Sequence, residues 1–183
     1  MKIISTDLDG VLVLVRDLYH DSRGYFMESF RETDLPVRFV QDNVSCSKKN
    51  VIRGLHYQIS HPQAKLVGVL RGSIVDVAVD IRDGSPNFGR WVSRVLSQKN
   101  GEQLFIPDGF AHGFCALEDD TIVQYKCSDV YCKEGACSIR WNDPQINIDW
   151  GNQESPIVSE VDGKAPFLAD ARLPHFIGNL DLR

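Results

Sequence analysis

Hydrophobic and polar residues alternate along most of the chain from about residue 20 to residue 150, in short runs separated by turn residues. Successive side chains of a β-strand point to opposite faces of a sheet, so a period of two predicts strands. Turn signals such as Asn100-Gly101 recur at the spacing of a β-sandwich or β-barrel. We therefore expect strands over 67–70, 74–81, 91–96, 103–106, 113–117 and 121–127.

Helices should be few and short, because no long stretch shows the helical period of 3.6 residues. Residues 84–90 and 142–156 are rich in Gly, Pro, Asn and Ser and are predicted to be loops, and Arg71-Gly72-Ser73 is predicted to be a tight turn. The pattern weakens after Val158, where we expect a short helix or coil packed on the sheets. A length of 183 residues fits one domain, so residues 1–183 are predicted to form a single all-β domain.

Composition narrows the class of function. The formal net charge of −5 argues against general nucleic-acid binding, although a local basic pocket for one anionic substrate remains compatible with it. The five cysteines are odd in number and form no C-x-x-C pair, which predicts the reduced thiols of a cytoplasmic protein. Asp7 and Asp9 interrupt the apolar start, so neither a signal peptide nor a membrane span is expected.

The segment Asp7-Leu8-Asp9-Gly10-Val11 resembles the D-x-D-G start of a phosphatase-type α/β domain. That fold needs a strand before the motif and helices after it. The residues that follow carry strand signals instead, so we expect a turn between two short strands.

Polar residues interrupt strand-like stretches at Arg53 to Gln58 and at Pro107 to Phe114. Such groups in apolar surroundings are costly unless they are paired or used. His56 and Gln58 should share one face of a strand, and Gly54 allows a bulge that would re-aim Arg53. The pattern predicts one pocket with a base, a cationic anchor and a second imidazole, which is typical of an enzyme.

Lys65 should share an apolar strand face with Val67 and Val69, which favours a functional lysine over a snorkelling one at a sheet edge. Tyr125, taken alone, is more typical of a core tyrosine.

Pro107-x-Gly109-x-x-His112 matches the second half of a cupin metal motif, but the first half reads His56-x-Gln58 with no nearby Glu. Two visible ligands are too few for a usual metal site, so no metal is expected. A core histidine in a turn is the ordinary interpretation of Pro107 to His112.

Residues Arg23 to Phe30 alternate strictly and place Phe26, Glu28 and Phe30 on one face of a predicted strand. A carboxylate between two aromatic rings is unusual for a plain strand. Such a pair could stack on a base and accept a ring N–H.

Together these segments resemble the dTDP-4-dehydrorhamnose 3,5-epimerases, sugar-nucleotide epimerases with a cupin-type barrel. The matching pieces run in family order over about residues 20–165: R-G-Y-F-M-E-S-F (23–30), F-V-Q-D-N-V-S (39–45), R-G-L-H-Y-Q (53–58), A-K-L-V (64–67), D-V-A-V-D-I-R (76–82), S-P-N-F-G-R-W (85–91), I-P-D-G-F-A-H-G-F (106–114), Q-Y-K-C (124–127) and W-N-D-P (141–144). The resemblance implies a jelly-roll barrel or sandwich, a homodimer, and no metal or organic cofactor. It implies epimerisation at carbons 3 and 5 of dTDP-4-keto-6-deoxy-D-glucose through proton abstraction next to the ketone.

The resemblance also assigns roles. His56 looks like the base, Asp162 like the carboxylate that orients it, Tyr125 like the acid on the opposite sugar face, and Lys65 like a group at the developing oxyanion. The residues that resemble substrate contacts are Arg23, Phe26, Glu28, Gln41, Asp42, Asn43, Arg53, Gln58, His112 and Tyr131. The resemblance implies that the first three reach the nucleotide from the partner subunit.

Two positions depart from the family pattern. Ala136 stands where members often carry Glu, and Val161 stands where they often carry Lys or Arg. Both changes concern ligand binding rather than proton transfer.

Three alternative functions stay open: a single-carbon epimerase or isomerase on a related keto-deoxy sugar nucleotide, a non-catalytic cupin-like sugar-binding protein, and a metal cupin.

Overall fold

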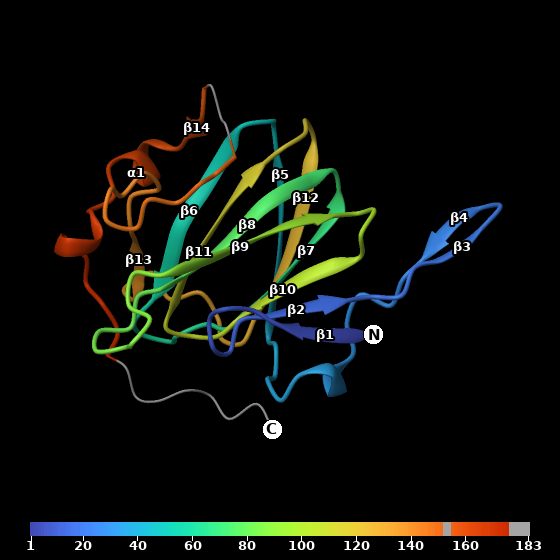
Figure 1. Ribbon diagram of the computed structural model, residues 1–183, viewed down its shortest axis with the longest axis horizontal. Coiled ribbons are helices and arrows are strands. Elements are labelled where there is room, and N and C mark those ends of the chain that lie inside the picture. The colour runs from blue at the N-terminus through green and yellow to red at the C-terminus, as the bar shows by residue number, and fades with distance from the viewer. Residues whose placement is uncertain (152–154, 176–183) are drawn as a thin grey trace.

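The alternating stretches pair into two antiparallel sheets that stack face to face as an open sandwich (Figure 1). The structure is a computed structural model and describes residues 1–151 and 155–175. Sheet A has the strand order β1-β2-β10-β7-β12-β5, with β1 (Lys2–Ser5), β2 (Leu12–Val15), β10 (Glu102–Ile106), β7 (Lys65–Arg71), β12 (Thr121–Cys127) and β5 (Gln41–Ser47). Sheet C has the order β13-β6-β11-β8-β9, with β13 (Ala136–Ser138), β6 (Val51–Gln58), β11 (Phe110–Ala116), β8 (Ser73–Asp80) and β9 (Trp91–Ser97). The all-β jelly-roll prediction is confirmed in its sandwich form.

Three apolar layers hold the sandwich together. The central layer lies between the sheets and includes Val67, Val123 and Ile74. A second layer, with Val77 and Trp150, lies on the outer face of sheet C under the chain that follows β13. A third layer lies on the outer face of sheet A under residues 30–39. Because both faces of the central strands are buried, five of the eight residues of β8 are apolar and they lie on both of its faces, as is typical of strands covered on two sides.

Helical residues in the described chain are confined to α1 (Glu160–Gly163) and two 3-10 turns, η1 (Glu32–Asp34) and η2 (Leu168–Asp170). The prediction of short helices near the C-terminus is confirmed. The last strand, β14 (Ile157–Val158), pairs in parallel with β6 and brings α1 beside it. Within the described ranges, no helix has the length and apolar character to cross a bilayer.

The tight turn predicted at Gly72 is present, since Gly72 is the one residue between the two strands. Gly72 does separate β7 from β8, but the two strands belong to different sheets, so the bend is a crossover between layers rather than a hairpin. Its φ of +78° is in the left-handed region, and a Cβ at this position would collide with Thr121. The turn predicted around Asp7 and Asp9 is confirmed, because it joins β1 to β2.

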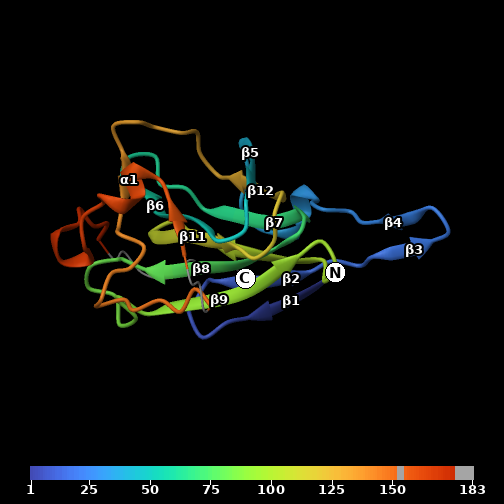
Figure 2. The same cartoon turned by 90° about the horizontal axis from the view of Figure 1, so that it is seen from above.

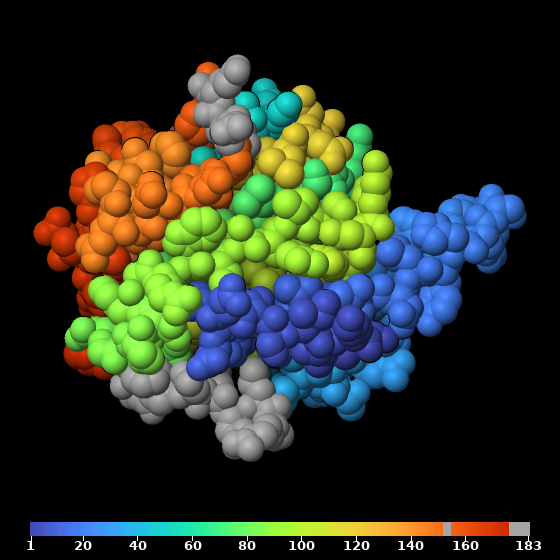
Figure 3. All heavy atoms as spheres, in the orientation of Figure 1, coloured from blue at the N-terminus to red at the C-terminus, as the bar shows by residue number. Residues whose placement is uncertain are grey.

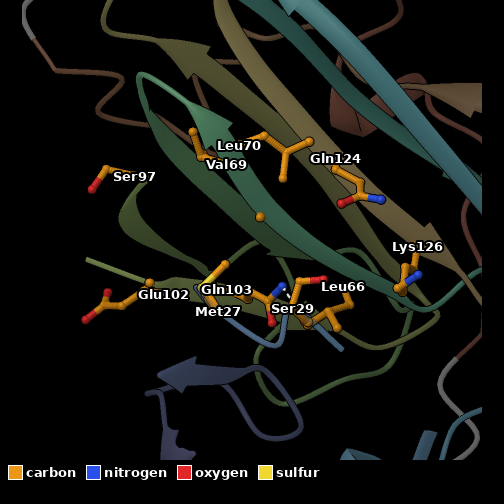
Figure 4. Close-up of a pocket in the computed structure, with 12 residues that line it drawn as sticks. Met27, Ser29, Leu66, Val69, Leu70, Ser97, Glu102, Gln103, Gln124 and Lys126 are labelled. Carbon is orange, nitrogen blue, oxygen red and sulfur yellow. Dashed lines mark hydrogen bonds between the residues drawn. The ribbon is translucent and has the colours of Figure 1, made fainter. Parts of the chain in front are cut away.

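The predicted strand from Arg23 to Phe30 is shorter than expected. Strand β4 (Gly24–Phe26) pairs only with β3 (Tyr19–Asp21), and the chain leaves the extended pairing after Phe26. This hairpin stands away from both sheets (Figures 1 and 2) and protrudes from the surface of the molecule (Figure 3). The following segment returns along sheet A, where the backbone carbonyl of Ser29 accepts a hydrogen bond of 2.9 Å from Gln103 Nε2 (Figure 4).

Candidate active site

A cavity of about 740 Å³ opens between the two sheets. Sheet C contributes residues of β6 and β11 to its wall, and sheet A contributes residues of β5, β7 and β12. Most of the sequence-predicted site residues line it, namely Gln41, Asn43, Arg53, His56, Gln58, Lys65, His112, Tyr125 and Tyr131. These include the base, the cationic anchor and the second imidazole that were predicted to share one pocket.

His56 and Asp162 form a hydrogen-bonded pair although they are 106 residues apart, with 2.6 Å between His56 Nε2 and Asp162 Oδ1. Helix α1 positions the carboxylate, because Ser159 caps the helix by accepting the Asp162 N–H. Burial raises the pKa of Asp162, but its hydrogen bonds with His56, Gly54 N–H and Ser159 outweigh burial and hold the pKa below its ordinary value. The ionised carboxylate accepts a hydrogen bond that Nε2–H donates, so the proton stays on Nε2 and Nδ1 of His56 is the basic atom.

Gly54 explains how Arg53 reaches the same cavity as His56. The pairing of β6 with β11 shifts register next to this glycine, between the partners of Arg53 and His56. Gly54 has a φ of +124°, and a Cβ there would lie 2.6 Å from the Cα of Gly113. The predicted bulge is confirmed: Arg53 lines the cavity, and its Nε donates to the Ser47 hydroxyl at 3.1 Å.

Lys65 lies on the inner face of sheet A with Val67 and Val69, as predicted, and is buried. Its Nζ lies 3.3 Å from the backbone carbonyl of His56. Burial lowers the pKa of Lys65, while Cys127 and Asp76 act in the opposite direction. Lys65 thus places a poorly hydrated amino group beside the backbone of His56, the setting in which a positive charge stabilises a nearby oxyanion most strongly.

Asp76 completes a second histidine–carboxylate pair that sequence reasoning missed. Its Oδ1 lies 2.7 Å from His112 Nε2, and its side chain is fully buried on the inner face of β8 between Ile74 and Ala78. Burial raises the pKa of Asp76, whereas His112 and Lys65 lower it. The signal was present in the sequence, since an aspartate inside an apolar strand run is costly unless paired.

Tyr125 projects from β12 on sheet A, across the cavity from His56 on sheet C. Burial raises the pKa of its phenol, with Arg53 acting against that rise. No hydrogen bond to the Tyr125 hydroxyl is present among the residues that the structure describes. A phenol without a hydrogen-bond partner, on the sheet opposite the one that carries the imidazole, can donate a proton to the far side of a ligand bound between them.

The cavity lining combines cationic groups with neutral ones. Arg53, Lys65 and Lys133 contribute to it together with the two imidazoles, and no carboxylate is among the described residues that line it. The carboxylates of Asp162 and Asp76 lie behind the histidines. A chain with a formal charge of −5 thus presents a locally basic pocket, which favours an anionic ligand.

Four predicted ligand contacts do not line the cavity of their own chain. Arg23 pairs with Asp21 at the exposed hairpin, and Glu28 pairs with Arg31. Phe26 is 68% exposed on the hairpin. Asp42 points to the outer face of sheet A, where it pairs with Lys126, because it alternates with Gln41 and Asn43 along β5. A role for these four residues in ligand contact stays a prediction.

In the described chain, no group of three or more His, Cys, Asp or Glu side chains gathers as a metal site would require. His56 and His112 are direct cross-strand neighbours, but each Nε2 faces its own carboxylate. All five cysteines are free thiols.

Comparison with known proteins agrees with this geometry. The family model described as dTDP-4-dehydrorhamnose 3,5-epimerase matches residues 5–170. The chain belongs to the dTDP-4-dehydrorhamnose 3,5-epimerase family. A relative with that name from Methanothermobacter thermautotrophicus is 49% identical over 168 residues, which cover 88% of this chain and 91% of the relative.

Solved structures of family members show the same fold. A dTDP-6-deoxy-D-glucose-3,5-epimerase from Legionella pneumophila, in complex with dTDP-4-keto-L-rhamnose, has a TM-score of 0.93 and 45% identity over 97% of this chain and 99% of that chain. A 3′-monoepimerase from Streptomyces bikiniensis, in complex with dTDP-quinovose, has a TM-score of 0.84 and 32% identity over 90% and 86% of the two chains. Proteins named as a 3,5-epimerase and as a 3′-monoepimerase thus share this fold.

Both departures from the family pattern lie at the cavity. Ala136 and Val161 are exposed residues of its lining. Lys164, the basic residue nearest to Val161 in sequence, forms an ion pair with Glu160. Lys133, three residues before Ala136, also lines the cavity and provides a cation there.

Proposed function

We propose that this chain inverts carbons 3 and 5 of dTDP-4-keto-6-deoxy-D-glucose and so produces dTDP-4-keto-L-rhamnose. The observation that carries the proposal is the arrangement of acid and base on opposite walls. His56, oriented by Asp162, lies on sheet C, and the free phenol of Tyr125 faces it from sheet A. A protein that only bound a sugar would need no acid and base on opposite faces.

Proton abstraction is the first step at each carbon. Nδ1 of His56 takes the proton next to the ketone, and Asp162 stabilises the resulting imidazolium through its 2.6 Å contact with Nε2. Negative charge develops on the ketone oxygen as the enolate forms. The buried ammonium of Lys65, assisted by Arg53 or His112, stabilises that charge.

Reprotonation from the opposite face completes the inversion. The Tyr125 phenol is protonated because burial raises its pKa, and it donates its proton to the carbon face turned toward sheet A. Return of a proton by His56 to the face it came from regenerates the substrate instead. No redox step occurs, since one proton leaves and one proton enters at each carbon.

The names of the relatives support double inversion. The curated relatives that are 38% to 49% identical are named 3,5-epimerases. The single-carbon alternative is supported by the 3′-monoepimerase, which has the lower identity of 32%.

The decisive experiment is NMR of the reaction in deuterated water. Each inverted carbon takes up one solvent deuterium, so the proposal expects deuterium at both carbons and product with both configurations changed. Deuterium at one carbon alone would establish the single-carbon alternative, and no incorporation would leave a binding protein. Elemental analysis of the purified protein tests the predicted absence of a metal.

We also propose that the chain forms a homodimer through the hairpin of β3 and β4. An isolated two-stranded hairpin is marginally stable in water, yet this one exposes Tyr19, Tyr25 and Phe26. Strand β5 is an edge strand of sheet A with Val44 exposed on the outer face, which offers an apolar surface to a partner. Arg23 and Phe26 would then reach the partner's ligand.

Light scattering together with an activity dilution series tests this assembly. We expect a dimer whose specific activity falls on dissociation. A fully active monomer at nanomolar concentration would overturn it. Replacing Phe26 with Ser should weaken the dimer, whereas the same change at Phe167 (36% exposed, on the C-terminal segment) should leave the assembly intact.

A further inference from the structure

The loop 128–135 crosses from β12 of sheet A to β13 of sheet C and lines the cavity through Tyr131 and Lys133. A second crossing, residues 59–64, runs beside it from β6 to β7. Backbone hydrogen bonds join the two crossings at both ends, between Ser128 N–H and Ala64 C=O and between Ile59 N–H and Gly135 C=O. The pocket wall here consists of irregular chain, which must be held by other means than a sheet ladder.

The side chain of Gln58 lies between these two crossings and is almost fully buried. Its Nε2 donates to the backbone carbonyls of His61 at 2.7 Å and Val130 at 3.3 Å. Its Oε1 accepts the backbone N–H of Cys132 at 2.8 Å. Both amide protons are therefore used within the protein.

Gln41 holds the same loop from the other sheet. Its Oε1 accepts the backbone N–H of Tyr131 at 2.9 Å. A third glutamine, Gln63, donates to the backbone carbonyl of Asp129 at 2.8 Å. Three side-chain amides thus bond consecutive residues of one loop, while Tyr131 itself remains 62% exposed at the cavity.

We propose that Gln58 is a positioning residue, which fixes the backbone of residues 130–132 so that Tyr131 forms a rigid wall for the nucleotide-sugar ligand. The inference rests on the proposed function. It differs from the direct substrate contact that the resemblance implies for Gln58, because the donors of this amide are already committed. A loop held in its binding conformation before the ligand arrives loses less conformational entropy on binding.

A double-mutant cycle on substrate affinity tests this role. Gln58→Met keeps the length and neutrality of the side chain but removes both donors and the acceptor. We expect KM to rise about tenfold with kcat changed less than about twofold, because the loop loses its anchor while His56 and Tyr125 stay in place. Tyr131→Ala should give the same pattern. The matched control is Gln145→Met, at an exposed glutamine outside the cavity, which should change neither constant.

The coupling between the two changes decides between positioning and direct contact. If Gln58 acts through Tyr131, adding Gln58→Met to Tyr131→Ala should raise KM less than about twofold further. The proposal would be overturned if the KM increases of the two single variants multiply in the double variant, or if Gln58→Met lowers kcat and leaves KM unchanged. If Gln58→Met does not fold, as judged by circular dichroism, Tyr131→Ala decides alone, and an unchanged KM in that variant overturns it.

Failure of the proposed function would be separately visible, since wild-type protein would then show no turnover. Calorimetric titration with dTDP would replace KM in that case. A Kd about tenfold weaker in both single variants supports the positioning role, and equal Kd values overturn it.

Discussion

Replacing Asp162 with Asn should switch the proton of His56 from one ring nitrogen to the other. Asp162 Oδ1 lies 2.6 Å from His56 Nε2, and Oδ2 accepts the Gly54 N–H at 3.3 Å. An asparagine has one oxygen and one NH₂ group for these two partners. The Gly54 N–H can only donate, so the amide oxygen must face it and the NH₂ group must face His56. Nε2 then becomes an acceptor, and the proton moves to Nδ1.

The catalytic loss follows from that tautomer. A protonated Nδ1 cannot take the substrate proton, so deuterium wash-in and epimerisation should both fall about 10²- to 10⁴-fold, as expected for loss of a general base. The free energy of unfolding should fall by only about 1 to 2 kcal/mol, because the bond to Gly54 is kept and the His56 side chain is about half exposed, which screens the lost ion pair. KM should change little, since Asp162 does not line the cavity.

The pH dependence of stability gives an independent check. The folded-state pKa of Asp162 is lowered, so between that value and the ordinary one of 3.8 the unfolded chain binds more protons. Its stabilisation is present above about pH 4 and is lost as the pH falls through the folded value. Asp162→Asn should therefore unfold with a shallower acid dependence than wild type.

Rates of deuterium incorporation by NMR and urea unfolding at several pH values measure both effects. The control is Asp170→Asn, at an exposed aspartate of η2, which should change neither. Near-normal wash-in by Asp162→Asn would refute the assignment of Nδ1 as the base.

Three further predictions concern other parts of the structure. Tyr125→Phe should retain deuterium wash-in by His56 but lose inverted product, as seen in one NMR time course; equal loss of both signals would remove Tyr125 from the role of acid. Gly54→Ala should cost about 3 kcal/mol or prevent folding, because its Cβ would meet Gly113 at 2.6 Å, whereas Gly163→Ala, with open space around it, should be nearly neutral in urea unfolding. Asp80→Asn should cost about 3 kcal/mol, since Arg82 would lose its charged partner in a buried pair, and a thermal melt within about 2 °C of wild type would contradict this.

Period-two alternation predicted strands well where each strand forms one regular ladder. The boundaries of β12 were predicted to the residue, and those of β8 nearly so. Alternation could not reveal which strands share a sheet, because Gly72 permits a bend into the other layer as readily as a hairpin. The strand predicted through Phe26 and Glu28 was too long for a related reason, since the alternation of its residues continues beyond the point where the pairing with β3 ends.

The candidate site was predictable to the extent that its residues stand out from their surroundings. His56, Lys65 and Arg53 are polar groups in apolar stretches, and all three line the cavity. The partner of His112 was not predicted, because cross-strand neighbours on β8 and β11 are set by the register of the sheet. The role of Gln58 was also hidden, since its hydrogen bonds go to backbone groups, which any sequence provides.

The basic lining of the cavity within an acidic chain has a consequence for substrate capture. At physiological ionic strength the Debye length is about 8 Å, so an approaching diphosphate first meets the diffuse field of the net charge and feels the pocket cations only in the last few ångströms. Added salt weakens the outer repulsion before it weakens the inner attraction. The association rate should therefore depend less on salt than it does for a uniformly cationic enzyme.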